Sequence, residues 1–270
     1  MGSDFSKDDC SQYPTMDERN LGNLRSYLCN YNPPEGCVGG INILLFGISR
    51  SGKSSIINTF LSALDPQGMT ITCVPIGRNS TSLTPELRTY RAGSLKFWDS
   101  AGWNALENTD QTKRVLQMIL EGRIPKGTKL HSFKPDLDVA KYPVIPENVI
   151  HGVALTFDVN TIDSITEEQM NLFKELQTIV AQKYIYRVVI GTKFDLLGIQ
   201  EYDHKRIYEY KPLQDKFTKL SEVTGMEKRS MFVVSNKWKG DKIEMINCIL
   251  TLSALENMIR NIDKFLKVMM

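Results

Sequence analysis

The chain lacks several features that would define its class at once. It has only five cysteines among 270 residues, and neither a C-x-x-C pair nor a cysteine–histidine spacing typical of zinc sites occurs. No apolar run approaches the roughly 18 residues of a membrane-spanning helix, and the polar start MGSDFSKDDC does not resemble a signal peptide. We therefore expect reduced thiols in a cytoplasmic protein rather than a disulfide scaffold, a zinc module or a transmembrane protein.

An excess of charge of one sign is also missing. Lysine and arginine total 33 against 31 acidic residues, a formal net charge of +2. This balance provides no broadly basic surface, so no nucleic-acid partner is expected. Hydrophobic residues at 41% and charged residues at 24% are typical of a globular chain and argue against general disorder.

Apolar runs of strand length alternate with longer segments of helical periodicity from residue 41 onward. Buried strands that alternate with helices predict an α/β fold, a three-layer sandwich with a mostly parallel sheet and helices on both faces. Gly93-Ser94, between two of the strand-like runs, indicates a hairpin and hence one antiparallel edge strand. The predicted core strands are 41–46, 95–98, 153–157, 187–191 and 231–234.

The same alternation predicts the domain organisation. We expect a leader with a short helix at 1–40 and a single domain at 41–270. A stretch at about 122–149 has several prolines and little periodicity, which indicates a surface insertion. An apolar stripe at about 244–268 predicts a C-terminal helix that packs on the sheet.

The segment GISRSGKS at 47–54 matches the phosphate-loop pattern G-x-x-x-x-G-K-[ST] at every position. It lies between a predicted strand and a predicted helix, so backbone N–H groups and the helix dipole would face phosphates. Lys53 would reach the β- and γ-phosphates, and the Ser54 hydroxyl would ligate Mg²⁺. The predicted nucleotide contacts here are Gly47, Ser49, Arg50, Ser51, Gly52, Lys53, Ser54 and Ser55.

Two segments between this loop and the middle of the chain would complete the phosphate site. Asp99-Ser100-Ala101-Gly102 follows a core strand, where Asp99 would hold Mg²⁺ through water and the Gly102 N–H would meet the γ-phosphate. A switch threonine should close on Mg²⁺ and the γ-phosphate from the turn-rich segment 79–85. Thr84 is the first choice and Thr81 the alternative.

Two later strand ends predict the base that is bound. Thr192-Lys193-Phe194-Asp195 fits the [NT]-K-x-D guanine-specificity motif: Asp195 can accept from N1–H and the exocyclic amine, and Lys193 can lay its stem along the base. Ser235-Asn236 follows the last strand, where a short S-A-K-like loop would offer a backbone N–H to guanine O6. Asn236 replaces the usual alanine. The predicted base site is Thr192, Lys193, Asp195, Ser235 and Asn236.

These elements, in this order at the carboxyl ends of strands, resemble the P-loop GTPase superfamily over about 41–237. Trp103 stands where Ras-like switches carry a glutamine that orients the attacking water, so hydrolysis would need another source of positioning. Arg50 resembles the loop arginine of the guanylate-binding protein and atlastin families. That resemblance implies an internal finger that stabilises charge on the γ-phosphate after a homodimer forms through the nucleotide face; an ordinary ion-pair role for Arg50 is the alternative.

Taken whole, the chain is most similar to the interferon-induced protein 44-like group of GTPase-related proteins. The resemblance rests on ILLFGISRSGKSSIINTF, STSLTPELRTYRAG, MILEGRIPKGTKL and NVIHGVALTFDVNTI. It implies a nucleotide-binding G domain with an interaction role, with GTP or GDP as the nucleotide and Mg²⁺ as the cofactor.

The first residues carry a separate signal. MGSDFSK fits the pattern for N-myristoylation of Gly2, and this predicts peripheral membrane contact. One myristoyl chain binds membranes only marginally, so a second signal would be required, and Cys10 could take a second acyl chain. Asp8-Asp9 weighs against this, and Met-Gly-Ser also begins many cloned proteins.

Three functions follow from these motifs. The first is a slow GTPase in which Lys53, Arg50 and Thr84 are the catalytic residues. The second is a nucleotide-gated scaffold that binds GTP and barely hydrolyses it. The third, a P-loop kinase that uses an adenine nucleotide, is opposed by the motif at 192–195.

Overall fold

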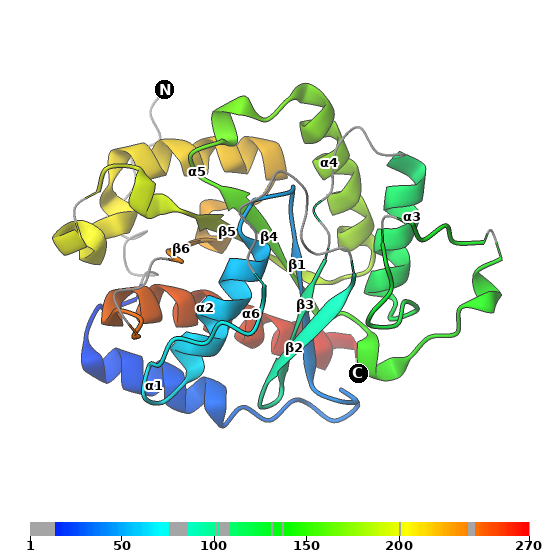
Figure 1. Ribbon diagram of the computed structural model, residues 1–270, viewed down its shortest axis with the longest axis horizontal. Helices are drawn as coiled ribbons and strands as arrows, with labels where there is room; N and C mark the ends of the chain where they lie inside the picture. Colours follow the sequence, from blue (N-terminus) through cyan, green and yellow to red (C-terminus); the bar gives the residue numbers. More distant parts are fainter. Residues whose placement is uncertain are drawn as a thin grey trace.

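The computed structural model describes residues 14–75, 86–100, 102, 109–130, 132–136, 138–199, 201–236 and 241–269. These residues form a six-stranded sheet in the order β2-β3-β1-β4-β5-β6 with helices on both faces (Figure 1). The strands are β1 (Ile41–Phe46), β2 (Arg88–Ala92), β3 (Leu95–Asp99), β4 (Gly152–Asp158), β5 (Tyr186–Thr192) and β6 (Met231–Val234).

Strand pairing confirms the predicted fold class. β2 runs antiparallel to β3 across the Gly93-Ser94 turn, and β3, β1, β4, β5 and β6 are parallel to one another. Every residue of the central strands β1 and β4 is buried. Strands covered on both faces need apolar side chains at successive positions, which explains why the sequence shows continuous apolar runs there.

The helices form two layers around the sheet. In Figure 1, α1 (Glu18–Cys29), α2 (Lys53–Leu64) and α6 (Met245–Met269) lie on one face, and α3 (Thr109–Leu120), α4 (Glu167–Gln182) and α5 (Lys211–Thr224) on the other. Short 3-10 helices are η2 (Val139–Lys141), η3 (Pro146–Asn148), η4 (Ile162–Ser164), η5 (Phe194–Leu196), η6 (Glu201–Glu209) and η7 (Lys228–Ser230). Within the described ranges, no helix combines the length and the apolar character needed to cross a membrane.

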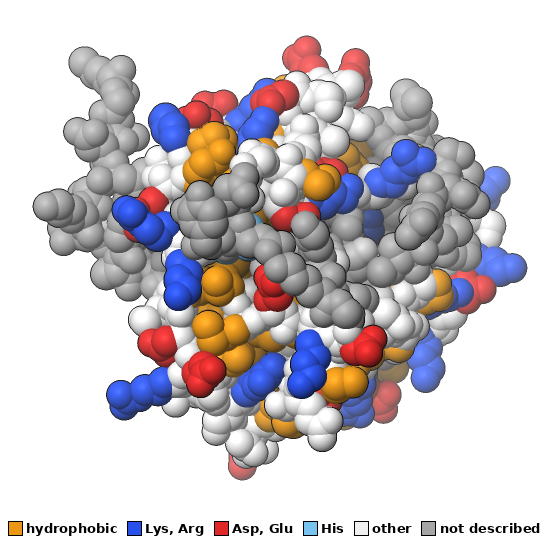
Figure 2. All heavy atoms as spheres, turned by 60° about the vertical axis from the view of Figure 1, so that its left-hand side comes forward, with side chains coloured by type: hydrophobic (Ala, Val, Ile, Leu, Met, Phe, Trp, Pro, Cys, Tyr) orange, Lys and Arg blue, Asp and Glu red, His pale blue; other side chains and the backbone are white. Residues whose placement is uncertain are grey.

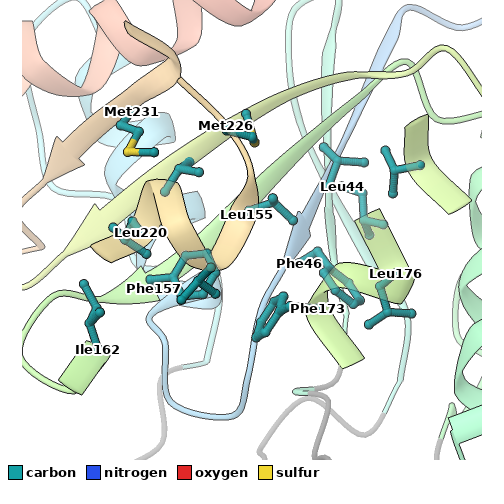
Figure 3. Close-up of a cluster of buried hydrophobic side chains, with 14 of the residues drawn as sticks. Leu44, Phe46, Leu155, Phe157, Ile162, Phe173, Leu176, Leu220, Met226 and Met231 are labelled. Carbon is teal, nitrogen blue, oxygen red and sulfur yellow. The ribbon is translucent and has the colours of Figure 1, made fainter. Parts of the chain in front are cut away.

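Each face of the sheet has its own hydrophobic core. On the α3, α4 and α5 face, Phe173 of α4 packs against two strand residues, with ring centroids 6.3 Å from Phe46 and 5.0 Å from Phe157 (Figure 3). On the opposite face, Phe60 of α2 stacks on Phe97 of β3 at 5.2 Å. The sheet is therefore covered on both faces by packed side chains, which gives a rigid platform for the loops that follow its strands.

The helix α1 contributes to the second core. Its side chains Leu24 and Leu28 are buried, and Arg25 donates from Nε to the Ala63 carbonyl at the end of α2, 2.9 Å away. The Tyr31 hydroxyl, just after the helix, donates to Asp263 of α6. These contacts bury α6 between α1 and the sheet.

A buried polar network around Asn42 of β1 attaches the end of the segment 122–149 to the sheet. The Asn42 side chain donates to the carbonyls of Glu147 and Val149 at 3.0 and 2.8 Å, and it accepts from the Trp98 indole at 2.9 Å. The Asn42 backbone N–H donates to Nδ1 of His151 at 2.9 Å. Burial, together with the charge of Lys96, lowers the pKa of His151 to about 4, so its ring is neutral and accepts this hydrogen bond at neutral pH.

The surface seen in Figure 2 carries lysine and arginine side chains interspersed with aspartate and glutamate. This distribution agrees with the small formal net charge of +2. On this face, a recognition site for a charged ligand would be built from local groups rather than from a broadly basic surface.

Candidate functional site

The phosphate loop connects the carboxyl end of β1 to the first turn of α2. Gly52 has φ +95° and is the N-cap of α2, a left-handed conformation that suits glycine. A Cβ on Gly47 would lie 2.3 Å from the Thr156 carbonyl oxygen of β4, so only glycine fits there. Arg50, exposed between them, also has a left-handed backbone with φ +64°. The loop thus has the curled backbone that presents N–H groups to an anion.

Lys53 begins α2 and curls back under this loop. Its ammonium donates to the carbonyls of Gly47 at 3.0 Å and Ile48 at 2.9 Å, and the residue is only 6% exposed. Burial lowers the pKa of Lys53 to about 8, against the opposing effect of the Asp99 carboxylate. Burial of a charged ammonium costs free energy, and a bound anion offsets that cost. The buried Lys53 therefore meets the electrostatic requirement of a phosphate site.

Ser54 and Asp99 meet where α2 begins and β3 ends. The Ser54 hydroxyl donates to Oδ2 of Asp99 at 2.7 Å, and Asp99 is 1% exposed. A hydroxyl and a carboxylate are the hard oxygen ligands that Mg²⁺ prefers, so the donor set fits this ion. Among the described residues, no group of three or more His, Cys, Asp or Glu side chains could hold a metal alone. A magnesium ion here would take further ligands such as water and phosphate oxygens.

Gly102 packs directly on the phosphate loop. A Cβ at this position would lie 2.4 Å from Cα and 2.5 Å from the backbone nitrogen of Ser49. Backbone atoms cannot move aside cheaply, so this approach requires glycine. The segment after β3 is thereby brought to the loop that follows β1, as the phosphate-site hypothesis requires.

Lys193 follows β5 and connects the predicted base site to the phosphate loop. Its backbone has φ +59°, and its ammonium donates to Oδ2 of Asp158 at 2.6 Å and to the Arg50 carbonyl at 3.3 Å. Asn160 donates from Nδ2 to Oδ1 of Asp158 and to the Lys193 carbonyl, both at 3.0 Å. The Lys193 stem is thus held over the edge of the phosphate loop.

Asp158 and Asn160 are site residues that sequence reasoning missed. Asp158 ends β4 as Asp99 ends β3, and a carboxylate at the carboxyl end of a core strand was the available signal. It is weak alone because aspartate is common after strands, and its ion pair with Lys193 depends on how β4 and β5 align.

Thr192 fixes the guanine-motif segment to the phosphate loop. Its hydroxyl lies 2.9 Å from the Ser51 carbonyl and 3.1 Å from the Phe157 carbonyl, and its methyl group would be 3.1 Å from a Cβ on Gly52. Phe194, two residues on, is fully buried. These contacts leave Lys193 and Asp195 as the partly exposed members of the motif.

The last two predicted base residues lie beside Asp195. β5 and β6 end in register, with Thr192 opposite Val234, and the Ser235 hydroxyl donates to Oδ1 of Asp195 at 3.1 Å. Oδ1 of Asn236 lies 2.7 Å from the Thr59 hydroxyl of α2. All five residues predicted for the base are therefore close to the carboxyl ends of β5 and β6.

Several predicted residues do not enter this geometry. The two switch candidates, Thr84 and Thr81, and Trp103 lie outside the described residues. Ser55 takes part through its carbonyl, 3.0 Å from the Thr59 hydroxyl. The role of each predicted site residue toward a nucleotide, including that of Arg50, stays a prediction.

Comparison with solved structures defines the class of fold. A dimerization-deficient variant of Toc33 from Arabidopsis thaliana matches with a TM-score of 0.51 and 12% identity over 94% of each chain. The structure of a probable GTP-binding protein, engB, matches with a TM-score of 0.48 and 15% identity, over 83% of this chain and 98% of that one. Toc33 in complex with GDP and Mg²⁺ gives 0.44 at 13% identity. The first of these matches shows the fold of the P-loop GTPase G domain, as predicted.

Sequence comparison then identifies the relatives. The chain is 26% identical to mouse interferon-induced protein 44 over 263 residues, which cover 91% of this chain and 60% of the relative. It is 26% identical to human interferon-induced protein 44-like over 250 residues, 88% of this chain and 55% of that protein. No protein-family model matches. The homologues are interferon-induced protein 44 proteins, which confirms the resemblance found in the sequence; the chain spans about three fifths of their length.

Proposed function

We propose that this chain binds guanine nucleotides with Mg²⁺, hydrolyses GTP slowly to GDP and acts as a nucleotide-dependent switch or assembly factor. The observation that carries the proposal is the joining of two half-sites at one end of the sheet. The phosphate half consists of Lys53, Ser54 and Asp99. The base half consists of Asp195 and Ser235. Lys193 and Thr192 link the base half to the phosphate loop.

Each half supplies a distinct part of the chemistry. Lys53 would exchange its loop carbonyls for phosphate oxygens and offset negative charge as the γ-phosphoryl group leaves. Ser54, Asp99 and the switch threonine would hold Mg²⁺, which when bound withdraws charge from the phosphates. The Asp195 carboxylate would accept from the N1–H and the 2-amino group of guanine, an arrangement that adenine does not offer.

Slow turnover is proposed because of two residues. Trp103 has no group that can orient an attacking water as glutamine does. Arg50 is exposed, so a second copy bound at the nucleotide face could direct it to the γ-phosphate. Homodimerisation through that face is therefore part of the proposal, and it would make turnover rise with protein concentration.

A nucleotide-gated scaffold is the second candidate function. Trp103 favours it, because a protein without a side chain that orients the attacking water would bind GTP and leave it intact. Both candidates share the nucleotide site and differ only in the chemical step.

Turnover measured against protein concentration separates these candidates. A GTPase would release phosphate at a rate per molecule that rises with concentration and falls in Arg50→Ala, whereas a scaffold would leave GTP intact after long incubation. Lys53→Ala should abolish binding in both cases, and Lys211→Ala, an exposed lysine in α5, should not. Rapid hydrolysis that is independent of concentration and of Arg50 would contradict the proposed mechanism.

Membrane contact through an acylated Gly2, in a cytoplasmic protein, is the last part of the proposal. Gly2 and Cys10 lie outside the described residues, so the support is the N-terminal pattern alone. Co-expression with an N-myristoyltransferase should add a myristoyl group to the chain but not to Gly2→Ala, as mass spectrometry would show. An unmodified wild-type chain would rule out this part.

A further inference from the structure

Side-chain hydrogen bonds position the start of the loop after β6, because the hydrogen bonds of the sheet end at the last residue of this strand. β6 pairs with β5 over four positions, the last being Val234 opposite Thr192. Ser235 donates to Asp195 at 3.1 Å, and Asn236 contacts Thr59 at 2.7 Å. These two polar contacts therefore take over the positioning of the backbone where the sheet hydrogen bonds end.

The far end of this loop returns to the same helix region. The Thr70 N–H donates to the Asp241 carbonyl at 2.9 Å, and the Ile243 N–H donates to the Gly68 carbonyl at 3.2 Å. Gly68 and Thr70 lie in the short segment that follows the end of α2 at Leu64. The described parts on either side of residues 237–240 are thus both attached to α2 or to the turn after it.

Thr59 is a buried anchor point. It is 0% exposed in the second turn of α2, and its hydroxyl lies 2.7 Å from Asn236 Oδ1 and 3.0 Å from the Ser55 carbonyl. A hydroxyl carries a single proton, so it donates to one of these oxygens at a time, and the shorter contact favours Asn236. The alanine usual at this position of the S-A-K-like loop has no group that could make this bond.

We propose that Asn236 is a positioning residue for guanine recognition. Held by the Thr59 hydroxyl, it keeps the loop after β6 in the place where a backbone N–H meets guanine O6. The bond also connects the base loop to α2, the helix that carries Lys53 and Ser54 at its start. This inference rests on the proposed binding of guanine nucleotides. It adds the side chain that positions the loop N–H, which in turn would select for oxygen at the 6-position of the base.

The chemistry separates this role from that of Asp195. Asp195 would read N1–H and the 2-amino group, whereas the loop N–H would read the 6-oxygen. A loop that loses its anchor should discriminate less at position 6 and equally well at position 2. A merely structural defect would change neither ratio selectively.

The experiment compares three nucleotides by equilibrium titration with Mg²⁺ present. GDP is measured against the 5′-diphosphate of 2,6-diaminopurine riboside, which has an amine in place of O6 and no hydrogen on N1, and against IDP, which lacks the 2-amino group. The loss of the N1–H contact is common to the wild type and the variants, so a change in the first ratio between them reports position 6. Thr59→Val and Asn236→Ala should each lower the preference for GDP over the diaminopurine nucleotide about fivefold, the effect of one neutral hydrogen bond. The preference for GDP over IDP should stay unchanged.

Three variants control the interpretation. Thr59→Ser keeps the hydroxyl and should keep the wild-type ratio. Thr251→Val removes a hydroxyl from another buried helical threonine, 0% exposed, which donates to the Asn247 carbonyl one turn back in α6, and it should change no ratio. The double variant of Thr59→Val and Asn236→Ala should lose no more than either single variant, since both remove the same bond.

The outcomes distinguish a failure of the positioning role from a failure of the proposed guanine binding. If wild-type protein prefers GDP and the single variants, with unchanged unfolding midpoints, keep the full 6-position preference, then the positioning role is wrong and guanine binding stands. Additive losses in the double variant would equally overturn the role. If wild-type protein shows no preference among the three nucleotides, the proposed guanine binding fails, and the positioning role fails with it.

Discussion

The Lys193 ammonium lies 2.6 Å from the Asp158 carboxylate, so the ends of β5 and β4 are joined by an ion pair at the border of the two half-sites. Asp158 is 9% exposed, and it also holds Asn160. The lysine stem, which would lie along the base, is thus oriented by a residue that has no direct part in base recognition. The first prediction follows from this pair.

Asp158→Ala should weaken GDP binding about tenfold, because Lys193 loses the charge-assisted bond that orients it. Asp158→Asn keeps an acceptor and should lose less. Affinities from equilibrium titration would check this, with Asp163→Ala, which removes an exposed carboxylate paired to Lys216 and Lys219, as the control. Equal affinities for the wild type and Asp158→Ala would show that Lys193 is positioned without Asp158.

Asp195→Asn should invert the preference at position 2 of the base. The asparagine amide presents a donor where the carboxylate accepts, so xanthine, with an oxygen at that position, should bind better than guanine. Titration with XDP and GDP measures the change, which we expect to exceed tenfold in the ratio. A variant that still prefers GDP would mean that Asp195 does not face the base.

The His151 ring predicts a pH dependence of stability. Its pKa is lowered by burial to about 4 in the folded state and is about 6.5 in an unfolded chain. Between pH 4 and 6.5 the unfolded state therefore binds a proton that the folded state does not. The stability that the neutral His151 ring contributes is fully present above pH 6.5 and is lost as the pH falls toward 4. The total is about 3 kcal/mol at most.

Urea denaturation of wild type and His151→Asn between pH 4.5 and 7.5 would isolate this contribution. Asparagine keeps an acceptor for the Asn42 N–H and does not titrate, so the difference between the two stabilities should shrink as the pH falls. A difference independent of pH would contradict the assignment.

Asn42→Ala should destabilise the fold by about 3 kcal/mol. It removes the partner of the Trp98 indole and the donor to two carbonyls of the segment 122–149, and buried polar groups left without partners each cost about 1–3 kcal/mol. Asn30→Ala, which removes an exposed amide bonded to the Ser26 carbonyl, should cost less than about 1 kcal/mol. Denaturation midpoints of the two variants would check this, and similar values would show that the network does not hold the insertion.

The sequence predicted those parts of the molecule that follow local rules. Apolar strand runs and helical periodicity led to the sheet, its antiparallel edge at β2 and the layers of helices. The loop 47–54 and Asp195 were identifiable because their motifs lie at strand ends, which meet at one edge of a parallel sheet.

The contacts between distant residues could not be predicted in this way. The bond between Thr59 and Asn236 joins residues 177 positions apart. The S-A-K-like pattern placed Asn236 in the base loop for its backbone N–H, and it gave no partner for the side chain. The ion pair of Asp158 with Lys193 depends on the register of β4 and β5. The attachment of α1 depends on Arg25 and Tyr31, whose partners Ala63 and Asp263 lie in other helices.

Competition between guanine and adenine nucleotides tests the central claim most directly. Purified chain would be titrated with a fluorescent GDP analogue in the presence of Mg²⁺, and the bound analogue would be displaced with GDP or ADP. Our account predicts that GDP displaces it at least a hundredfold more efficiently than ADP, and that Lys53→Ala binds neither. Equal displacement by ADP, or binding that survives in Lys53→Ala, would contradict the account.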